Sequence, residues 1–367
     1  MAKTVTSKAK PKKSATEIKP VWWKRLRHRS WRIVKSKPFI IVAAVLVVLI
    51  LINSFAWQPI KNPQYGVSFS VKYAEELGSD WKANFIALLD DMHVKRFRLM
   101  SYWDRIEKSP GKYDFSELDW QMDQAAKRDV KISLAIGLRQ PRWPECHRPD
   151  WAKKLAKPEQ NQELSKFIEA TVKHVKNHPA LASYQLENEA LNGWFGECTS
   201  VDIERDRLAQ EFSMVKDLDP SHPIYMSLSD QHGFPAGSLV PDKYGFSVYR
   251  VVYSTQLPIH FYMTYPTPTT YHRLRAWLIN RIKHRQVFIH ELQLEPWGAK
   301  ATKDLSIEEQ NKSMNTEQMK FNLDFAKRIG QPEIYVWGSE WWYWRMNHFN
   351  DSGPWDTFKQ ELQRYPG

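Results

Sequence analysis

The sequence predicts an α/β protein, a (β/α)8 barrel preceded by a single N-terminal transmembrane helix. Three observations support this. Eight short apolar runs alternate with helix-like segments between residues 64 and 363, which is the pattern of such a barrel. A segment without charge, residues 39–57, precedes them. No glycine-rich phosphate loop follows an early run, and this counts against the alternative, a doubly wound open sheet.

The eight expected strands are short runs rich in apolar, β-branched and aromatic residues. They span 64–70, 94–100, 130–137, 184–190, 224–229, 244–249, 287–291 and 334–337. The fourth stops on the pair Asn188-Glu189, and the seventh stops on Glu291. Parallel strands of one barrel direct their carboxyl ends to the same face, so both glutamates are expected there.

Helices are expected where apolar residues recur at intervals of three and four. They lie after Ser79-Asp80, after Ser116, and at 164–175, 201–218, 271–282, 316–329 and 355–363. Gly330 is a plausible end for the helix at 316–329. The connection 230–243 contains too much Gly and Pro for a full helix, and residues 251–267 are expected to be irregular.

The N-terminal segments differ sharply in charge. Residues 1–38 contain 13 Lys or Arg and one acid, a net charge of 13 − 1 = +12, and are predicted to be a disordered cytoplasmic tail. Residues 39–57 are predicted to be a transmembrane signal-anchor helix. The positive-inside rule then places residues 58–367, the expected catalytic domain, outside the cytoplasm of a single-pass cell-membrane protein. A cleaved signal peptide ending near Ala56 is the alternative.

The rest of the chain is formally neutral, with 53 − 13 = 40 basic and 41 − 1 = 40 acidic residues. The positive net charge is therefore no argument for nucleic-acid binding by the main domain. The tail is expected to contact anionic lipid headgroups. A rival hypothesis makes the tail the functional part, recruiting lipid or nucleic acid inside the cell.

Cys146 and Cys198 are the only cysteines. Each follows a predicted strand, on neighbouring loops of one barrel face. Outside the cytoplasm such a pair can be oxidised, so we predict a disulfide between them. The alternative is two unpaired, small hydrophobic side chains.

Two carboxylates at one barrel face suit the hydrolysis of a glycosidic bond. One acid protonates the leaving oxygen, while the second either attacks the sugar or activates water. Glu187 and Glu295 are rival carboxylates. Glu187 is two residues from Glu189, so on a strand it would share the same side. Glu295 would lie in the loop past the seventh strand, and we rank Glu291 above it.

Asn188-Glu189 on strand four and Glu291 on strand seven resemble the clan A retaining glycoside hydrolases, the superfamily of cellulases, xylanases and β-galactosidases. The resemblance covers residues 64–363 and implies Glu189 as acid/base, Asn188 as the contact to the sugar 2-hydroxyl, and Glu291 as nucleophile. Ala190 is a departure, because many members have Pro there.

Three further positions match that superfamily. Arg98 on strand two corresponds to an Arg near the nucleophile, and Tyr249 at the end of strand six to an aromatic residue or His. Trp337 on strand eight corresponds to the Trp that forms the floor of the sugar site.

Aromatic rings stack on the apolar faces of sugars, and several tryptophans fall at or beyond strand ends. They are Trp103, Trp143, Trp194, Trp297, Trp337, Trp341 and Trp342. We expect substrate contact for Trp143 and Trp337. Arg139, Gln140 and His147 are candidates for binding hydroxyls, with structural roles equally open.

Histidines show no metal-ligand spacing, so neither a metal nor a cofactor is expected. His290 precedes Glu291 and is expected to point to the opposite side of its strand, as packing.

The sequence therefore predicts a membrane-anchored retaining glycoside hydrolase acting on β-linked oligo- or polysaccharide. A transglycosylase would use the same residues. A carbohydrate-binding barrel without catalysis is the alternative from another class. Sugar identity, linkage, exo or endo action and oligomeric state stay open.

Overall fold

The computed structural model describes residues 38, 40, 41, 44, 45, 47, 48 and 58–366, except 193–195, 199–201, 229–231, 236, 238 and 256–259. The chain divides into two units, residues 1–56 and 57–367. The predicted tail, apart from Pro38, and most of the predicted membrane segment lie outside the described residues. Among the described residues, no helix combines the length and apolar character needed to cross a membrane. The transmembrane helix therefore stays a prediction.

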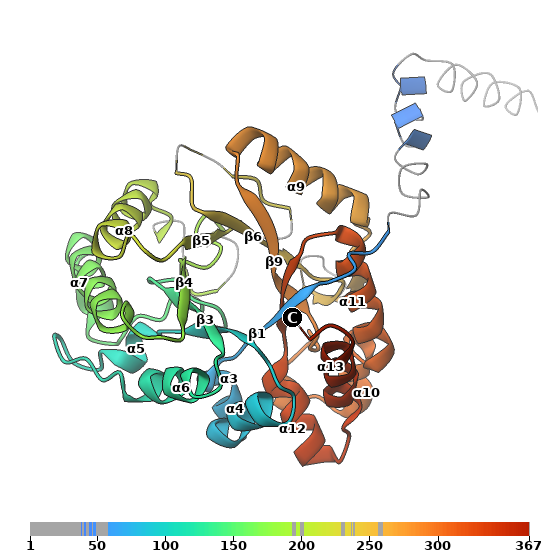
Figure 1. Ribbon diagram of the computed structural model, residues 1–367, viewed down its shortest axis with the longest axis horizontal. Helices are drawn as coiled ribbons and strands as arrows, with labels where there is room; N and C mark the ends of the chain where they lie inside the picture. The colour runs from blue at the N-terminus through green and yellow to red at the C-terminus, as the bar shows by residue number, and fades with distance from the viewer. Residues whose placement is uncertain are drawn as a thin grey trace, which may run out of the picture. The chain divides into compact units, whose positions relative to one another are not determined.

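Eight parallel strands close into a barrel, which confirms the predicted barrel fold (Figure 1). They are β1 (Gln64–Ser68), β2 (Arg96–Met100), β3 (Lys131–Ile136), β4 (Leu181–Leu186), β5 (Ile224–Ser227), β6 (Lys243–Val248), β9 (Gln286–Gln293) and β10 (Glu333–Trp337). Their order around the barrel is β1-β10-β9-β6-β5-β4-β3-β2. Both faces are covered, so strands such as β3 are buried at almost every residue.

Helices surround the barrel, with α7 and α8 packed together on one side and α9, α11 and α13 on the other (Figure 1). Their bounds are α3 (Val71–Glu76), α4 (Trp81–Asp90), α5 (Trp103–Ile106), α6 (Ser116–Ala126), α7 (Lys157–Val175), α8 (Arg205–Leu218), α9 (Thr269–Lys283), α10 (Ile307–Ser313), α11 (Thr316–Ile329), α12 (Ser339–Phe349) and α13 (Gly353–Arg364). The predicted boundaries at Asp80 and Gly330 are confirmed. The Asp80 carboxylate caps two amides of α4, and Gly330 ends α11 with a φ of 81°.

Two regions differ from the prediction. Residues 251–267 were expected to be irregular but contain an antiparallel pair, β7 (Val251–Ser254) and β8 (Phe261–Thr264). The helix α12, which follows β10 directly, was not predicted. Its buried residues lie on several faces, so its sequence lacks the polar face that marks a surface helix. Between β5 and β6, the described residues contain no helix, as expected.

Polar and aromatic side chains fill the barrel interior. Tyr225, Phe288 and Tyr335 form one buried aromatic cluster. Strands approach closely at Gly245, where an added Cβ would lie 2.8 Å from the Cβ of His290. The glycine therefore makes room for that ring within the sheet.

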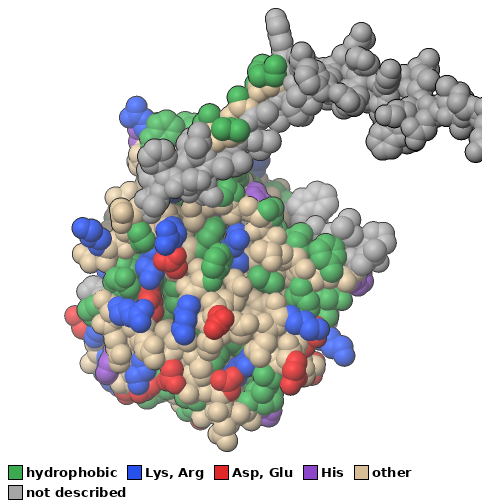
Figure 2. Space-filling view, turned by 90° about the vertical axis from the view of Figure 1, so that its right-hand side faces the viewer, with side chains coloured by type: hydrophobic (Ala, Val, Ile, Leu, Met, Phe, Trp, Pro, Cys, Tyr) green, Lys and Arg blue, Asp and Glu red, His purple; other side chains and the backbone are tan. Residues whose placement is uncertain are grey.

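Charged side chains of both signs lie side by side on the face shown in Figure 2. This agrees with the formal neutrality of the chain after residue 38.

Candidate active site

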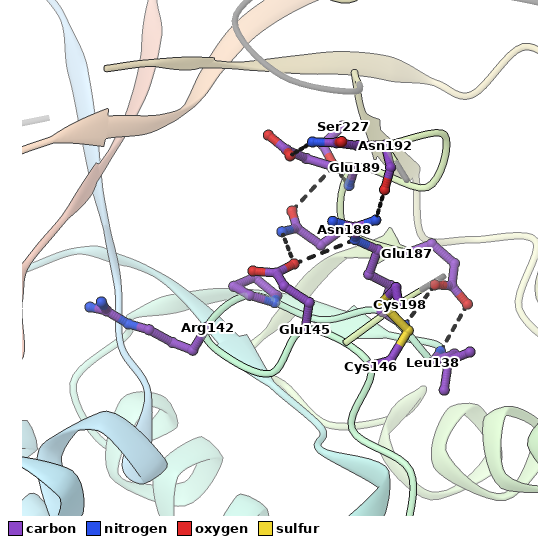
Figure 3. Close-up of polar contacts among 12 residues, drawn as sticks. Leu138, Arg142, Glu145, Cys146, Glu187, Asn188, Glu189, Asn192, Cys198 and Ser227 are labelled. Carbon is purple, nitrogen blue, oxygen red and sulfur yellow. Dashed lines mark hydrogen bonds and ion pairs between the residues drawn. A yellow bond between two sulfur atoms is a disulfide. The ribbon is translucent and has the colours of Figure 1, made fainter. Parts of the chain in front are cut away.

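Glu189 lies in the turn that follows β4, not at the end of the strand itself. The strand stops at Leu186, and Glu189 has a φ of 45°. Its amide donates a 2.6 Å hydrogen bond to Ser227 Oγ. Its carboxylate accepts hydrogen bonds of 2.9 Å from Ser247 Oγ and from Asn192 Nδ2. The carboxyl of Glu189 is thus held by neutral donors over the barrel mouth (Figure 3).

Glu291 lies within β9, which continues to Gln293. One carboxylate oxygen accepts a 2.9 Å hydrogen bond from Arg98 Nη1, and the other accepts one of 2.8 Å from Tyr249. The Arg98–Glu291 ion pair is buried, with side-chain exposures of 2% and 5%. Glu291 is therefore the glutamate of the pair that has a cation beside it.

The two glutamates are close. One side-chain atom each from Glu189, His290 and Glu291 lies within 4.8 Å of the others. Carboxyl groups of retaining glycosidases are about 5–5.5 Å apart, whereas inverting enzymes need about 6.5–9.5 Å for an intervening water. The two carboxyl groups therefore lie side by side in the barrel.

The environments of the two carboxyls push their pKa values apart. Burial, strengthened by the negative charge of Glu291, raises the pKa of Glu189 to about 7. Burial acts to raise the pKa of Glu291, but the Arg98 guanidinium, His290 and the hydrogen bonds from Arg98 and Tyr249 together outweigh it, and the pKa is lowered. Between the lowered pKa of Glu291 and about pH 7, Glu189 is mainly protonated while Glu291 is ionised.

Asn188 is fixed by a buried network. Its side-chain oxygen accepts hydrogen bonds from Arg98 Nη2 at 2.9 Å and from Gln185 Nε2 at 3.1 Å. Its Nδ2 donates one of 3.1 Å to Glu145 (Figure 3). Arg98 also donates from Nε to Gln185. The Asn188 side chain is thus held at both of its polar atoms.

Glu145 is a site residue that the sequence did not indicate. It lies on the loop between β3 and α7, is 5% exposed, and sits beside Asn188. Burial raises the pKa of the Glu145 carboxyl to about 8. The positive charge of Arg139 acts to lower this pKa, and the negative charges of Glu189 and Glu291 act to raise it further. No local pattern distinguishes it, because its position depends on how the loop folds back.

The predicted disulfide between Cys146 and Cys198 is confirmed, and it joins this loop to the one after β4 (Figure 3). The two cysteines are 52 residues apart in sequence. Loop-closure entropy gives such a crosslink about 4 kcal/mol of stabilisation. The bond ties the segment carrying Glu145 to the segment that follows Glu189.

Glu187 does not share the side of Glu189, so that prediction was wrong. Both residues have positive φ, 52° for Glu187, and strand alternation has already ended. The Glu187 carboxylate accepts hydrogen bonds from the amides of Leu138 and Arg139 and from Arg207. It anchors the loop after β3 and faces away from the barrel mouth.

Glu295 is paired with a cation from another loop. Both of its carboxylate oxygens accept from Arg142, which also lies 3.3 Å from Glu340. Glu291, in contrast, faces Glu189 directly, which supports the ranking of Glu291 over Glu295 as nucleophile. The Arg142 guanidinium also lies 3.9 Å from the ring centre of Trp337, which is only 7% exposed. Trp337 thus lies at the barrel mouth, but with a ring face covered by protein.

Among the other predicted contacts, Trp143 is 63% exposed on the loop after β3. His147 is fully buried, with one ring nitrogen 2.9 Å from Lys72 Nζ and the other 3.2 Å from the Arg142 carbonyl. This geometry gives His147 a supporting place under the loop, and a contact with substrate hydroxyls is not supported.

The remaining aromatic and polar candidates are either buried in the core or partly exposed. Trp103, Trp341 and Trp342 are buried core residues whose indole N–H groups bond to protein partners. Trp297 is half-buried and packs edge-to-face on Tyr249, and Trp194 lies outside the described residues. Gln140 donates to the backbone carbonyls of Ser101, after β2, and Gly137, after β3, and Arg139 is buried beside Glu145.

His290 does not point away from Glu291, contrary to the prediction. The pairing of β6 with β9 shifts register between Ile289 and Glu291, so His290 and Glu291 both face the interior. His290 Nε2 lies 3.5 Å from Glu291 Oε1. The spacing of residues along the chain did not predict that His290 and Glu291 would lie together with Glu189. The Arg98 guanidinium at the same carboxylate opposes a bound cation, so we assign no metal here.

A closed parallel barrel with a close pair of buried glutamates at its mouth is an arrangement typical of retaining glycoside hydrolases. The family model of glycoside hydrolase family 42, described as Beta-galactosidase, matches residues 73–218. The match includes Arg98, Asn188 and Glu189, covers less than half of the chain, and ends before Glu291. No curated protein sequence matches this chain.

Solved structures share the fold at low sequence identity. The exo-β-1,4-mannosidase Op5Man5 from Opitutaceae bacterium strain TAV5 has a TM-score of 0.53 and 13% identity, over 77% of this chain and 54% of its own. GH5_18 from Streptomyces cattleya, in complex with GlcNAc, gives 0.52 and 11%, over 76% and 71%. Endo-glycoceramidase II from Rhodococcus sp. gives 0.50 and 14%, over 76% and 73%.

This chain thus spans about half the length of the mannosidase. The family-model match and the shared barrel confirm the resemblance to the clan A glycoside hydrolases.

Proposed function

We propose that this protein is a membrane-anchored retaining glycoside hydrolase that cleaves β-linked glycans at or near the cell surface. The carrying observation is the Glu189–Glu291 pair, with atoms within 4.8 Å and pKa values displaced in opposite directions. Both residues are buried, at 9% and 4% exposure, so their charges are poorly screened by solvent.

The proposed reaction has two displacements. Glu291 attacks the anomeric carbon while Glu189 gives its proton to the leaving glycosidic oxygen, and a glycosyl ester forms on Glu291. Glu189, now ionised, then takes a proton from water, whose oxygen attacks the same carbon and releases Glu291. Arg98 and Tyr249 hold the Glu291 carboxylate, and Asn188 offers its amide hydrogen to the sugar 2-hydroxyl.

A sugar hydroxyl in place of that water gives transglycosylation. The described residues are the same for both outcomes, so product analysis distinguishes them. The class of β-glycans is suggested by the named relatives, an exo-β-1,4-mannosidase and a family of β-galactosidases.

The dependence of kcat/KM on pH tests the proposed roles. Glu189 must be protonated, so the rate should fall as pH rises through about 7. Glu291 must be ionised, so the rate should fall on the acid side only below the ordinary carboxyl pKa of 4.5. Glu189→Gln should abolish the alkaline limb in the residual activity on an aryl glycoside with a good leaving group. An unchanged alkaline limb in that variant would contradict the role of Glu189.

Membrane anchoring rests on the sequence of residues 39–57, which lack charge and follow a tail of net charge +12. The full chain should stay with the membrane pellet after alkaline carbonate washing, and a chain that begins at Gln58 should not. Release of the full chain by the wash would reject the anchor while leaving the enzyme assignment intact.

A further inference from the structure

Glu145 is a buried carboxyl beside the proposed catalytic pair, and the two displacements described above make no use of it. Its residue is 5% exposed, and the negative charges of Glu189 and Glu291 both act on it. Burying a carboxyl costs free energy unless the group is hydrogen-bonded, so its partners indicate what it does.

The backbone around Glu145 holds the residue from two sides. The Glu145 amide donates a 2.8 Å hydrogen bond to the carbonyl of Arg142, and the Glu145 carbonyl accepts one of 2.9 Å from the amide of Gln140. From the loop after β4, a Cβ added to Gly196 would lie 2.7 Å from the Cβ of Glu145. Glu145 has a φ of 71°, a strained value that a residue with a side chain keeps only when its surroundings enforce it. The two loops therefore fix where the carboxyl lies.

A chain of hydrogen bonds leads from Glu145 to the proposed nucleophile. Glu145 Oε2 accepts a bond of 3.1 Å from Asn188 Nδ2 (Figure 3). Asn188 Oδ1 accepts one of 2.9 Å from Arg98 Nη2, and Arg98 Nη1 donates one of 2.9 Å to Glu291 Oε1. Glu145 is thus linked to Glu291 through Asn188 and Arg98.

The direction of the Asn188 amide depends on contacts at both of its ends, because the bond about which it turns has only a broad, roughly two-fold preference. Its oxygen accepts from Arg98, Gln185 and Ser227. On the nitrogen side, the partner among the described residues is Glu145. Contacts at the oxygen alone would let the amide swing about them, so Glu145 completes its orientation.

We propose that Glu145 is a positioning residue, which holds the Asn188 amide in the direction that meets the sugar 2-hydroxyl in the transition state. This inference rests on the proposed function, in which Asn188 makes that contact. Hydrogen bonds to the 2-hydroxyl strengthen in the transition state of glycoside cleavage. A misdirected amide therefore slows the cleavage of sugars that carry this hydroxyl, and it has little effect on sugars that lack it.

The Glu145 carboxyl can hold Asn188 without a charge. Burial raises its pKa to about 8, so at about pH 6 it is mainly protonated and accepts through its carbonyl oxygen. Glutamine has nearly the same shape and offers the same kind of oxygen, so Glu145→Gln should preserve the orientation of Asn188. Glu145→Ala removes the acceptor, and Glu145→Asp withdraws it by one methylene group.

The test compares 4-nitrophenyl β-glycosides of glucose, galactose, mannose and xylose with their 2-deoxy counterparts, on the full chain at about pH 6. In Glu145→Ala, kcat/KM should fall about tenfold or more on the 2-hydroxy substrate and less than about threefold on the 2-deoxy substrate. Glu145→Gln should stay within about threefold of wild type on both. Glu197→Ala removes an exposed carboxylate from the facing loop and is the matched control, with wild-type rates expected.

A second comparison asks whether the effect passes through Asn188. In an Asn188→Ala background, Glu145→Ala should lower kcat/KM by less than about threefold more, because the group that it orients is gone. An undiminished loss in that background would overturn the inference. If Glu145→Ala does not fold by circular dichroism, Glu145→Asp takes its place with the same expected losses.

The remaining outcomes separate this inference from the proposed function. Equal losses on the 2-hydroxy and 2-deoxy substrates, or no loss on either, would overturn the positioning role and leave the glycosidase assignment standing. A loss in Glu145→Gln as large as that in Glu145→Ala would do the same, because the acceptor oxygen is kept. A folded wild-type protein that hydrolyses none of these glycosides would overturn both.

Discussion

Three clusters in this barrel each combine one arginine with two buried glutamates, and two of them lie on either side of the turn after β4. Of these two, one has the geometry that we propose for catalysis. The inner cluster, Arg98 with Glu189 and Glu291, lies at the barrel mouth. The outer cluster is Arg207 with Glu187 and Glu211. Arg207 lies on α8, and Glu187 follows β4 two residues before Glu189, so the two clusters are separated by the turn after one strand.

The difference lies in how the cation is shared. Arg207 pairs with both outer glutamates, and Glu187 also accepts two backbone amides, so the outer cluster anchors a loop. Arg98 pairs with Glu291 and not with Glu189, and among the described residues the side-chain donors to the Glu189 carboxylate, Ser247 and Asn192, are neutral. Burial raises the pKa of Glu211 to about 8, beyond the value of about 7 for Glu189. A raised pKa alone therefore does not identify a catalytic acid. The proposed assignment depends on two facing carboxyls whose pKa values are shifted in opposite directions.

Single replacements of the glutamates should give the largest difference in kcat between the two clusters. Glu291→Gln removes the nucleophile and should lower kcat by about 10⁴-fold or more, and Glu189→Gln should cost about 10²–10⁴-fold, less with a good leaving group. Glu211→Gln should leave kcat within about threefold of wild type, because it removes only a group that is proposed to be structural. Initial rates on an aryl glycoside measure all three. Comparable losses in the Glu211 and Glu189 variants, with both folded, would remove the distinction between the clusters.

Replacing each arginine sharpens the comparison with a smaller effect. Arg98→Met and Arg207→Met each leave a buried carboxylate without its cation and should lower the free energy of unfolding by about 3–5 kcal/mol. Only Arg98→Met should move the acid limb of kcat/KM to higher pH, because the pKa of Glu291 would rise without Arg98. Denaturant unfolding measures the loss of stability, and pH–rate profiles measure the position of the acid limb. A shifted acid limb in the Arg207 variant would contradict the account.

The sequence predicted the eight barrel strands because parallel strands buried on both faces read as continuous apolar runs. Their boundaries were less certain: β4 ends at Leu186 and β9 runs on to Gln293. The helix α12 was missed because Trp341, Trp342 and Trp344 are buried and leave no amphipathic pattern. The local hydrophobic pattern therefore predicts a helix or strand well only where it has a clear apolar face or a clear period along the chain.

The candidate glutamates were found from their places after predicted strands, and the pairing of Cys146 with Cys198 from neighbouring loops. The side on which Glu187 and His290 lie was not predictable, because a turn with positive φ and a bulge both break strand alternation. Glu145 and Arg142 reach the site through long-range folding of one loop. Such contacts depend on tertiary structure and produce no recognisable spacing of residues in the sequence.

Trapping of the covalent intermediate tests the central claim most directly. The full chain would be incubated with activated 2-deoxy-2-fluoro β-glycosides, and the intact mass and peptide map measured. The sugars are glucose, galactose, mannose and xylose. The account predicts a mass increase of one fluorosugar, located on Glu291 and absent in Glu291→Gln. An adduct on Glu295 or on any other residue would contradict the assigned nucleophile. The absence of any adduct on folded protein that hydrolyses these sugars would contradict the retaining mechanism.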